Sequence, residues 1–215
     1  MTDHFSPPPL LSAFLAASLL LAVTPGPGVF YIVARSLAQG RRSGLISVAG
    51  VALGNLGSAF AASLGLAALF AISSAAFTLV KYAGAIYLVW LGVRMVRASR
   101  AREPATVRRE APARHIFRDG IIVALLNPKT MLFFAAFLPQ FLGPEGRSPA
   151  HTMALGGLFV AIAAITDSAY ALAAGTVSRA LARGGRADRL GRMFGGATLI
   201  GLGILGVFHG SRHCR

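Results

Sequence analysis

The sequence has little of what soluble domains and cysteine-based sites are built from. It contains one cysteine, Cys214, which excludes an internal disulfide framework and leaves no cysteine-based metal site. Acidic residues number 7, and charged residues make up only 13% of the chain. A soluble domain of this size carries about twice that share of charge. The composition therefore argues against an ordinary soluble protein.

Apolar residues are abundant instead. Hydrophobic residues form 55% of the sequence, and the mean hydropathy is +0.65. They gather in six runs, and most of these reach the ~20 residues that a helix needs to cross a bilayer. We predict an all-α integral membrane protein of six transmembrane helices, at about 10–34, 44–67, 74–96, 120–142, 152–176 and 193–210.

The basic residues fix an orientation. The net charge of +14 would also suit a nucleic-acid-binding protein, but that class gathers basic residues on one face of a folded domain. Here 16 of the 21 Lys and Arg fall in the first, third and fifth gaps between runs, and three lie on the other side. This asymmetry predicts that the odd gaps face the cytoplasm and that both termini lie outside it, with no nucleic-acid partner.

Two prolyl breaks interrupt the apolar runs. The first is Thr24 to Gly28, with two prolines and two glycines, and the second is Asn127-Pro128-Lys129. A polar loop, about 99–118, separates three runs from three, so the two halves must insert with opposite topology. We predict one membrane domain of two inverted three-helix repeats, about 10–98 and 119–210, with the first and fourth helices broken. Residues 24–25 and 127–128 correspond at an offset of 103.

Each break resembles a helix start. Thr24 and Asn127 are good N-cap residues, and Pro25 and Pro128 suit the first helical position. A helix N-terminus inside the membrane would attract an anionic group, such as a substrate carboxylate. A plain proline kink that shapes packing is the alternative. The candidate substrate-binding residues are those of the two breaks and one polar residue of the second run: Thr24, Pro25, Gly26, Pro27, Gly28, Asn55, Asn127, Pro128 and Lys129.

Two ionisable residues lie deep in the runs, Lys129 and Asp167. Counting 1.5 Å per residue places both, with Thr24, in the inner half of a ~30 Å core. Asp167 is predicted to carry a proton or to bind a substrate amino group, because low dielectric favours the neutral form of a carboxyl group. Lys129 would be its counter-charge or would bind a substrate carboxylate. A purely structural ion pair is the alternative for both.

Other polar residues have simpler interpretations. Asn55 either bonds a neighbouring helix or lines a cavity. Tyr87, Trp90 and Arg94 are typical anchors at the inner interface, and Asp119 suits the start of the fourth helix. No histidine cluster or Ser/His/Asp arrangement falls in the runs, so neither an enzyme nor a bound metal is expected. His209, His213 and Cys214 are too few for a metal site.

Three motifs in order resemble the LysE/RhtB family of amino-acid exporters. They are Thr24 to Gly28, then Lys81 to Gly92, then Leu126 to Lys129 continuing to Phe137-Leu138-Pro139-Gln140-Phe141. The resemblance covers about 10–210. It implies an exporter of amino acids in the bacterial inner membrane, driven by the proton motive force, and it is consistent with a homo-oligomer. Pro27 stands where some relatives carry another small residue.

The leading hypothesis is therefore an amino-acid/proton antiporter that works by alternating access. It needs no cofactor, and sodium is the alternative coupling ion. The competing hypothesis is a membrane scaffold whose arginine-rich cytoplasmic loops bind anionic lipid or a protein partner.

Overall fold

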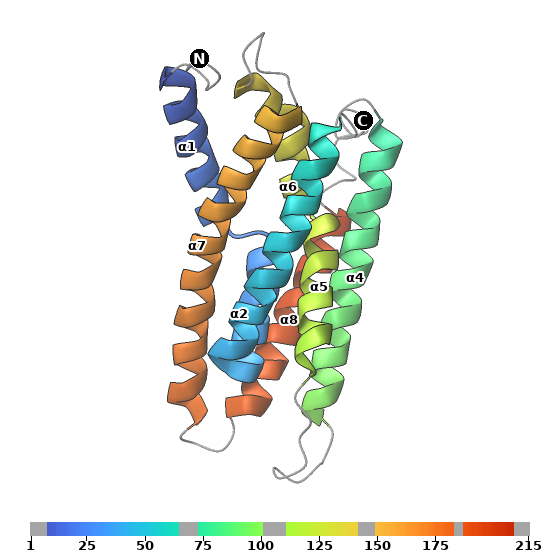
Figure 1. Cartoon of the computed structure of the whole chain (residues 1–215). Helices are drawn as coiled ribbons and strands as arrows, with labels where there is room; N and C mark the ends of the chain where they lie inside the picture. The colour runs from blue at the N-terminus through green and yellow to red at the C-terminus, as the bar shows by residue number, and fades with distance from the viewer. Residues whose placement is uncertain (1–7, 65–72, 101–110, 142–148, 183–186, 209–215) are drawn as a thin grey trace.

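A computed structural model describes residues 8–64, 73–100, 111–141, 149–182 and 187–208. Within these ranges all regular structure is helical, which confirms the predicted all-α class, and the helices run side by side in one bundle (Figure 1). The elements are α1 Pro8–Val23, α2 Pro27–Ser63, α4 Ser74–Arg100, α5 Ala113–Leu125, α6 Pro128–Leu132, the π-helical turn η1 Phe133–Phe137, the 3₁₀ turn η2 Leu138–Phe141, α7 Pro149–Ala182 and α8 Ala187–Phe208.

The long helix α2 folds back on itself at Gly40. This glycine has φ 80° and ψ −176°, a conformation that residues with a Cβ rarely adopt, and the helix is not regular there. Gly44 consequently packs against Ser36, so that a Cβ at Gly44 would lie 2.0 Å from the Ser36 hydroxyl. In a straight helix, residues eight apart would be separated by about 12 Å. The two arms of α2 therefore lie side by side (Figure 1).

Both predicted breaks are present, but the first helix start lies two residues later than predicted. Thr24 does not cap the second arm. Its hydroxyl donates to the Leu20 carbonyl at 2.7 Å and so closes the last turn of α1. The N-cap of α2 is Gly26, in extended conformation, and Pro27 occupies the first turn. A threonine hydroxyl can bond the carbonyl four residues back as readily as an amide ahead of it, and here the backward bond forms.

At the second break the prediction is confirmed. Asn127 is the N-cap of α6, its side chain accepts from the Lys129 amide at 3.1 Å, and Pro128 follows at the start of the helix. The segments 113–125 and 128–141 meet at an angle of 46°. The fourth predicted run is thus a bent helix, as the proline required.

Among the described residues, three helices are long and apolar enough to cross a membrane, or four if the bent pair counts as one span. Large apolar side chains such as Leu20, Leu79, Ile86 and Ile165 are exposed on the bundle, as lipid-facing residues would be. The six-span inverted repeat remains a prediction. The predicted loop 99–118 falls partly, and the tail residues His209, His213 and Cys214 fall wholly, outside the described residues.

Glycines set the closest helix contacts. A Cβ at Gly50 would lie 2.2 Å from the Phe117 carbonyl of α5, and one at Gly92 would lie 2.5 Å from the Gly196 carbonyl of α8. These contacts hold α2 against α5 and α4 against α8. The apolar core divides into two clusters, one around Tyr31, Ile32 and Leu91 and one around Phe14, Phe134 and Leu155.

Candidate functional site

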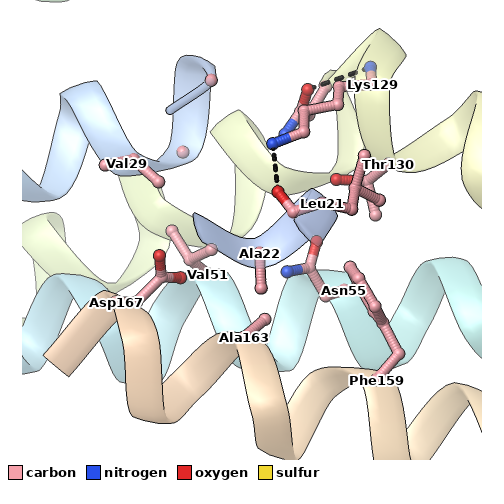
Figure 2. A pocket seen from close by; sticks show the side chains of 13 residues that line it. Leu21, Ala22, Val29, Val51, Asn55, Lys129, Thr130, Phe159, Ala163 and Asp167 are labelled. Carbon is pink, nitrogen blue, oxygen red and sulfur yellow. Dashed lines mark hydrogen bonds between the residues drawn. The ribbon is translucent and has the colours of Figure 1, made fainter. Parts of the chain in front are cut away.

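A small cavity lies where the two breaks meet, at the junction of the two core clusters (Figure 2). Its volume is about 40 Å³. Six of the predicted site residues line it: Gly26, Gly28, Asn55, Asn127, Lys129 and Asp167. Residues from both halves of the sequence and from α7 thus face one space, although the helices that carry them are far apart along the chain.

Four of the predicted residues do not line this cavity. Thr24 and Pro25 are exposed, and neither Pro27 nor Pro128 reaches it. The prolines form the breaks without facing the cavity. Thr130 and Phe159 do line it and were not predicted. Thr130 is buried. It is a polar residue directly after Lys129 in an apolar run, and this sequence signal could have identified it.

The start of α2 lies at this cavity and carries backbone amides without a partner in the helix. Gly28 and Val29 both line it. They are the first residues of α2 after Pro27, so their amides have no carbonyl one turn back within the helix. Gly26 supplies no side-chain cap. The Phe30 amide, one residue further, already donates to the Gly26 carbonyl at 3.0 Å. The positive end of a helix dipole therefore faces the cavity.

The end of α1, which carries the opposite dipole, is bonded to side chains from two other elements. The Lys129 ammonium donates to the Leu21 carbonyl at 2.6 Å (Figure 2). It also donates to the Thr24 carbonyl. The Tyr170 hydroxyl of α7 donates to the Val23 carbonyl at 2.8 Å. Lysine is a suitable partner for the carbonyl end of a helix. Lys129 thus joins the second break to the first.

Asp167 enters the cavity from α7 with its carboxyl group free. The residue is only 6% exposed, and it forms no hydrogen bond or ion pair with any other described residue. The alternative of a structural ion pair with Lys129 does not form as a direct contact here, because the ammonium is bonded to α1 carbonyls instead.

Asn55 faces the same cavity from the second arm of α2. It is 5% exposed, and its side-chain oxygen is buried without a hydrogen-bond partner among the described residues. Asn55 therefore lines a cavity, which is one of its two sequence interpretations. A buried amide oxygen without a partner is costly and is ready to accept a hydrogen bond from a ligand or from water.

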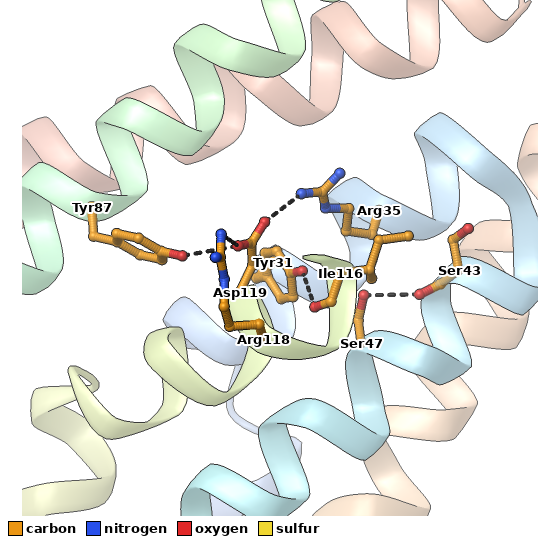
Figure 3. Close-up of polar contacts among 8 residues, drawn as sticks. All are labelled: Tyr31, Arg35, Ser43, Ser47, Tyr87, Ile116, Arg118 and Asp119. Carbon is orange, nitrogen blue, oxygen red and sulfur yellow. Dashed lines mark hydrogen bonds and ion pairs between the residues drawn. The ribbon is translucent and has the colours of Figure 1, made fainter. Parts of the chain in front are cut away.

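A second polar cluster joins α2, α4 and α5 (Figure 3). Arg35 of α2 donates to Asp119 of α5 at 2.9 Å, and Tyr87 of α4 donates to the same carboxylate at 3.1 Å. Arg35 and Asp119 are both buried. Tyr31 adds a bond to the Ile116 carbonyl at 2.7 Å. This cluster is separated from the cavity. Along the helix axis, Arg35 lies roughly 10 Å from Gly28, and Asp119 lies roughly 12 Å from Asn127.

The sequence did not predict this cluster. The first predicted run ends at residue 34, which places Arg35 among the basic residues of the first cytoplasmic gap, whereas helix α2 continues past it. Asp119 was read as a helix-start residue and Tyr87 as an interfacial anchor. Trp90 and Arg94 fit the anchor interpretation better, since Trp90 is 45% exposed and the Arg94 guanidinium lies 4.6 Å from the centre of its ring.

The arrangement suits a ligand with both charges. The residues that line the cavity supply donors at the uncapped start of α2 and acceptors at Asp167 and Asn55. The described residues contain no group of three or more His, Cys, Asp or Glu side chains that could hold a metal ion.

Known proteins match most of the chain. The family model described as LysE type translocator matches residues 19–209. The homoserine/homoserine lactone efflux protein of Salmonella typhimurium is 31% identical over 87% of this chain and 91% of its own length. The leucine efflux protein of Klebsiella pneumoniae is 27% identical over 87% of this chain and 90% of its own. An uncharacterized membrane protein of Vibrio cholerae is 30% identical over 90% of this chain and 94% of its own.

No solved structure matches. The family model covers far more than half of the chain, and it agrees with the three sequence motifs. The chain belongs to the LysE/RhtB family of translocators.

Proposed function

We propose that the protein is a secondary active exporter of amino acids or their close derivatives, exchanging them for protons across the bacterial inner membrane. The observation that carries the proposal is the shared cavity. Gly28 and Val29, at the uncapped start of α2, line it together with the unpaired carboxyl group of Asp167 and the buried amide oxygen of Asn55. Membership of a translocator family supports the transport function, and the efflux relatives support the substrate class.

The substrate would bind by its two charges. Its carboxylate accepts hydrogen bonds from the Gly28 and Val29 amides, where the helix dipole favours an anion. Its ammonium group donates to Asp167 and Asn55. Lys129 does not contact the substrate in this scheme, since its ammonium is bonded to the end of α1. It positions the amides by holding the first break in shape.

Proton exchange follows from the cost of a bare carboxylate in the bundle. A buried charge is expensive unless it is paired or neutralised. Asp167 can be neutralised by the substrate ammonium or by a proton, but one carboxylate does not hold both. Release of substrate to the outside would then require that a proton take its place, and binding of the next substrate from the cytoplasm would release that proton. This competition couples the two fluxes.

The volume of the cavity supports a mechanism with alternating access. About 40 Å³ holds only a few water molecules, whereas small-molecule sites usually measure about 300–1,000 Å³. The helices around the cavity must therefore separate to admit an amino acid. In a six-helix inverted repeat with both termini outside, the Arg35–Asp119–Tyr87 cluster lies on the cytoplasmic side of the cavity. It would form the inner barrier, opening when Arg35 and Asp119 part.

Transport in proteoliposomes tests the proposal. Vesicles loaded with labelled homoserine or leucine are given a pH gradient, and the flux is compared for the wild type and Asp167→Asn. We expect gradient-driven flux in the wild type and its loss to the level of protein-free vesicles in the variant, which cannot titrate. A sodium gradient applied at equal pH identifies the alternative coupling ion. If no tested amino acid moves under either gradient, the exporter proposal fails.

A further inference from the structure

A second, larger cavity opens at the Gly40 end of the bundle, between α2, α4 and α8 and beside the residues that precede α5. Its volume is about 700 Å³. Four arginines line it, Arg35, Arg94, Arg97 and Arg192, together with short apolar side chains such as Ala38 and Ala98. This volume lies within the range of small-molecule sites.

Two of the arginines in this cavity have no carboxylate partner among the residues that the structure describes. Asp119 neutralises Arg35 at 2.9 Å. No carboxylate of another described residue lies within ion-pair distance of Arg94 or Arg97. Arg35 also keeps one donor unused. The residue is only 5% exposed, and its Nε has no hydrogen-bond partner among the described residues. An oxyanion would meet this need, since guanidinium groups are suited to phosphate. A zwitterionic amino acid is less suited, because its ammonium group would face the same arginines.

The cavity lies at the level expected for lipid headgroups. Trp90 is 45% exposed and stacks on Tyr87, with ring centres 5.5 Å apart. Tryptophan side chains on the outside of membrane proteins concentrate at the headgroup region. Arg94 lies over the Trp90 ring at 4.6 Å and also lines the cavity, so one side chain connects the lipid-facing surface to the basic interior.

We propose that this cavity binds the phosphate group of an anionic phospholipid. Arg94 and Arg97 hold the phosphate oxygens, and Arg35 donates through its Nε. Basic pockets between transmembrane helices on the cytoplasmic side are suited to such headgroups. The bound lipid would join α2, α4 and α8 at the end of the bundle where the inner barrier lies. The site is separate from the substrate cavity.

Native mass spectrometry of the purified full chain tests this inference. The protein is incubated with equal amounts of phosphatidylglycerol and phosphatidylcholine, and the bound lipid is counted. We expect the wild type to retain phosphatidylglycerol preferentially. The double variant R94Q/R97Q should bind phosphatidylglycerol roughly tenfold more weakly, since each arginine near an anionic lipid contributes to its affinity. The control is R42Q, because Arg42 is exposed and does not line the cavity. R97K, which keeps the charge, should retain most of the binding and guards against a folding defect.

Three results would overturn the inference. Equal retention of both lipids would show no headgroup selectivity, and equal binding by wild type and double variant would place the lipid elsewhere. Displacement of phosphatidylglycerol by inorganic phosphate, or by homoserine or leucine, would show a site for free anions or for substrate. Because the measurement requires no transport, its failure leaves the exporter proposal intact, and an inactive exporter could still bind lipid.

Discussion

The two breaks look alike in sequence but end their helices differently. At the second, Asn127 caps the new helix with its own side chain and thereby occupies the Lys129 amide. At the first, Gly26 provides no cap, and the amides of Gly28 and Val29 remain open to the cavity. At the second break a residue of the break itself caps the new helix, whereas at the first break amide donors are left for a ligand.

On the other side of the first break, the carbonyl groups that end α1 do have hydrogen-bond partners. There the end of α1 is bonded to Lys129 and to Tyr170, from two other elements. With the negative end satisfied by a cation, the positive end alone is free to bind an anion. The similar motifs thus divide two tasks: the first break offers the binding groups, and the second supplies the lysine that holds them in place. The four predictions below test this division.

Lys129→Met should have the largest effect on stability. Methionine keeps most of the length but cannot bond the Leu21 and Thr24 carbonyls. Leaving such groups without a partner costs about 2 kcal/mol, which lowers the melting temperature of a chain of this size by roughly 4–8 °C. Thermal unfolding in detergent measures it. Lys81→Met is the matched control, because Lys81 lies over the Tyr82 ring at 5.8 Å and not at a break. Equal melting temperatures for the two variants would contradict the capping role.

Gly26→Ser should weaken substrate binding without harming the fold. A serine at the N-cap would occupy the amides of α2 that we assign to the substrate carboxylate. The competing bond is worth about 1 kcal/mol, so the KM for export should rise roughly five- to tenfold. The new Cβ would meet the flexible Lys129 side chain at 3.0 Å, which can shift.

Gly157→Ser provides the control for that variant, since a Cβ there meets nothing within 4 Å. Steady-state export in proteoliposomes gives KM for both. An unchanged KM in Gly26→Ser, with normal folding, would mean that the carboxylate binds elsewhere.

Asn127→Ala should destabilise the second break by about 1 kcal/mol, because it removes the side-chain cap on the Lys129 amide. Asn127→Ser should restore most of this, since serine is an equally good N-cap. The midpoint of thermal unfolding distinguishes the two. If alanine and serine behave alike, the cap contributes nothing and the two breaks are more similar than the structure indicates.

Thr24→Val should have the smallest effect, about 0.5 kcal/mol or less. The residue is exposed, and its hydroxyl only returns to the Leu20 carbonyl within α1. Were Thr24 the N-cap that its sequence position indicates, the loss would be about 1 kcal/mol, as for Asn127→Ala. Melting temperatures of the two variants, measured together, therefore decide whether the breaks are equivalent.

Much of the candidate site could be predicted from the sequence, since a polar or helix-breaking residue in an apolar run is a local signal. Gly26, Gly28, Asn127, Lys129, Asp167 and Asn55 were found in this way and share one cavity. Arg35 and Asp119 could not be found, because each lies near the end of a run, where charged residues are ordinary. Only their burial against each other makes them unusual.

The sequence by itself determined that the chain is helical and apolar, where its helices break, and to which family it belongs, because these depend on local composition and on motifs. The tertiary structure decided the partners. A threonine can cap forward or bond backward, and a lysine can bind a carboxylate or a carbonyl. The choice depends on which groups the packed helices bring within hydrogen-bond distance. Lys129 faces the end of α1 rather than Asp167 for this reason, and the free carboxyl group is the result.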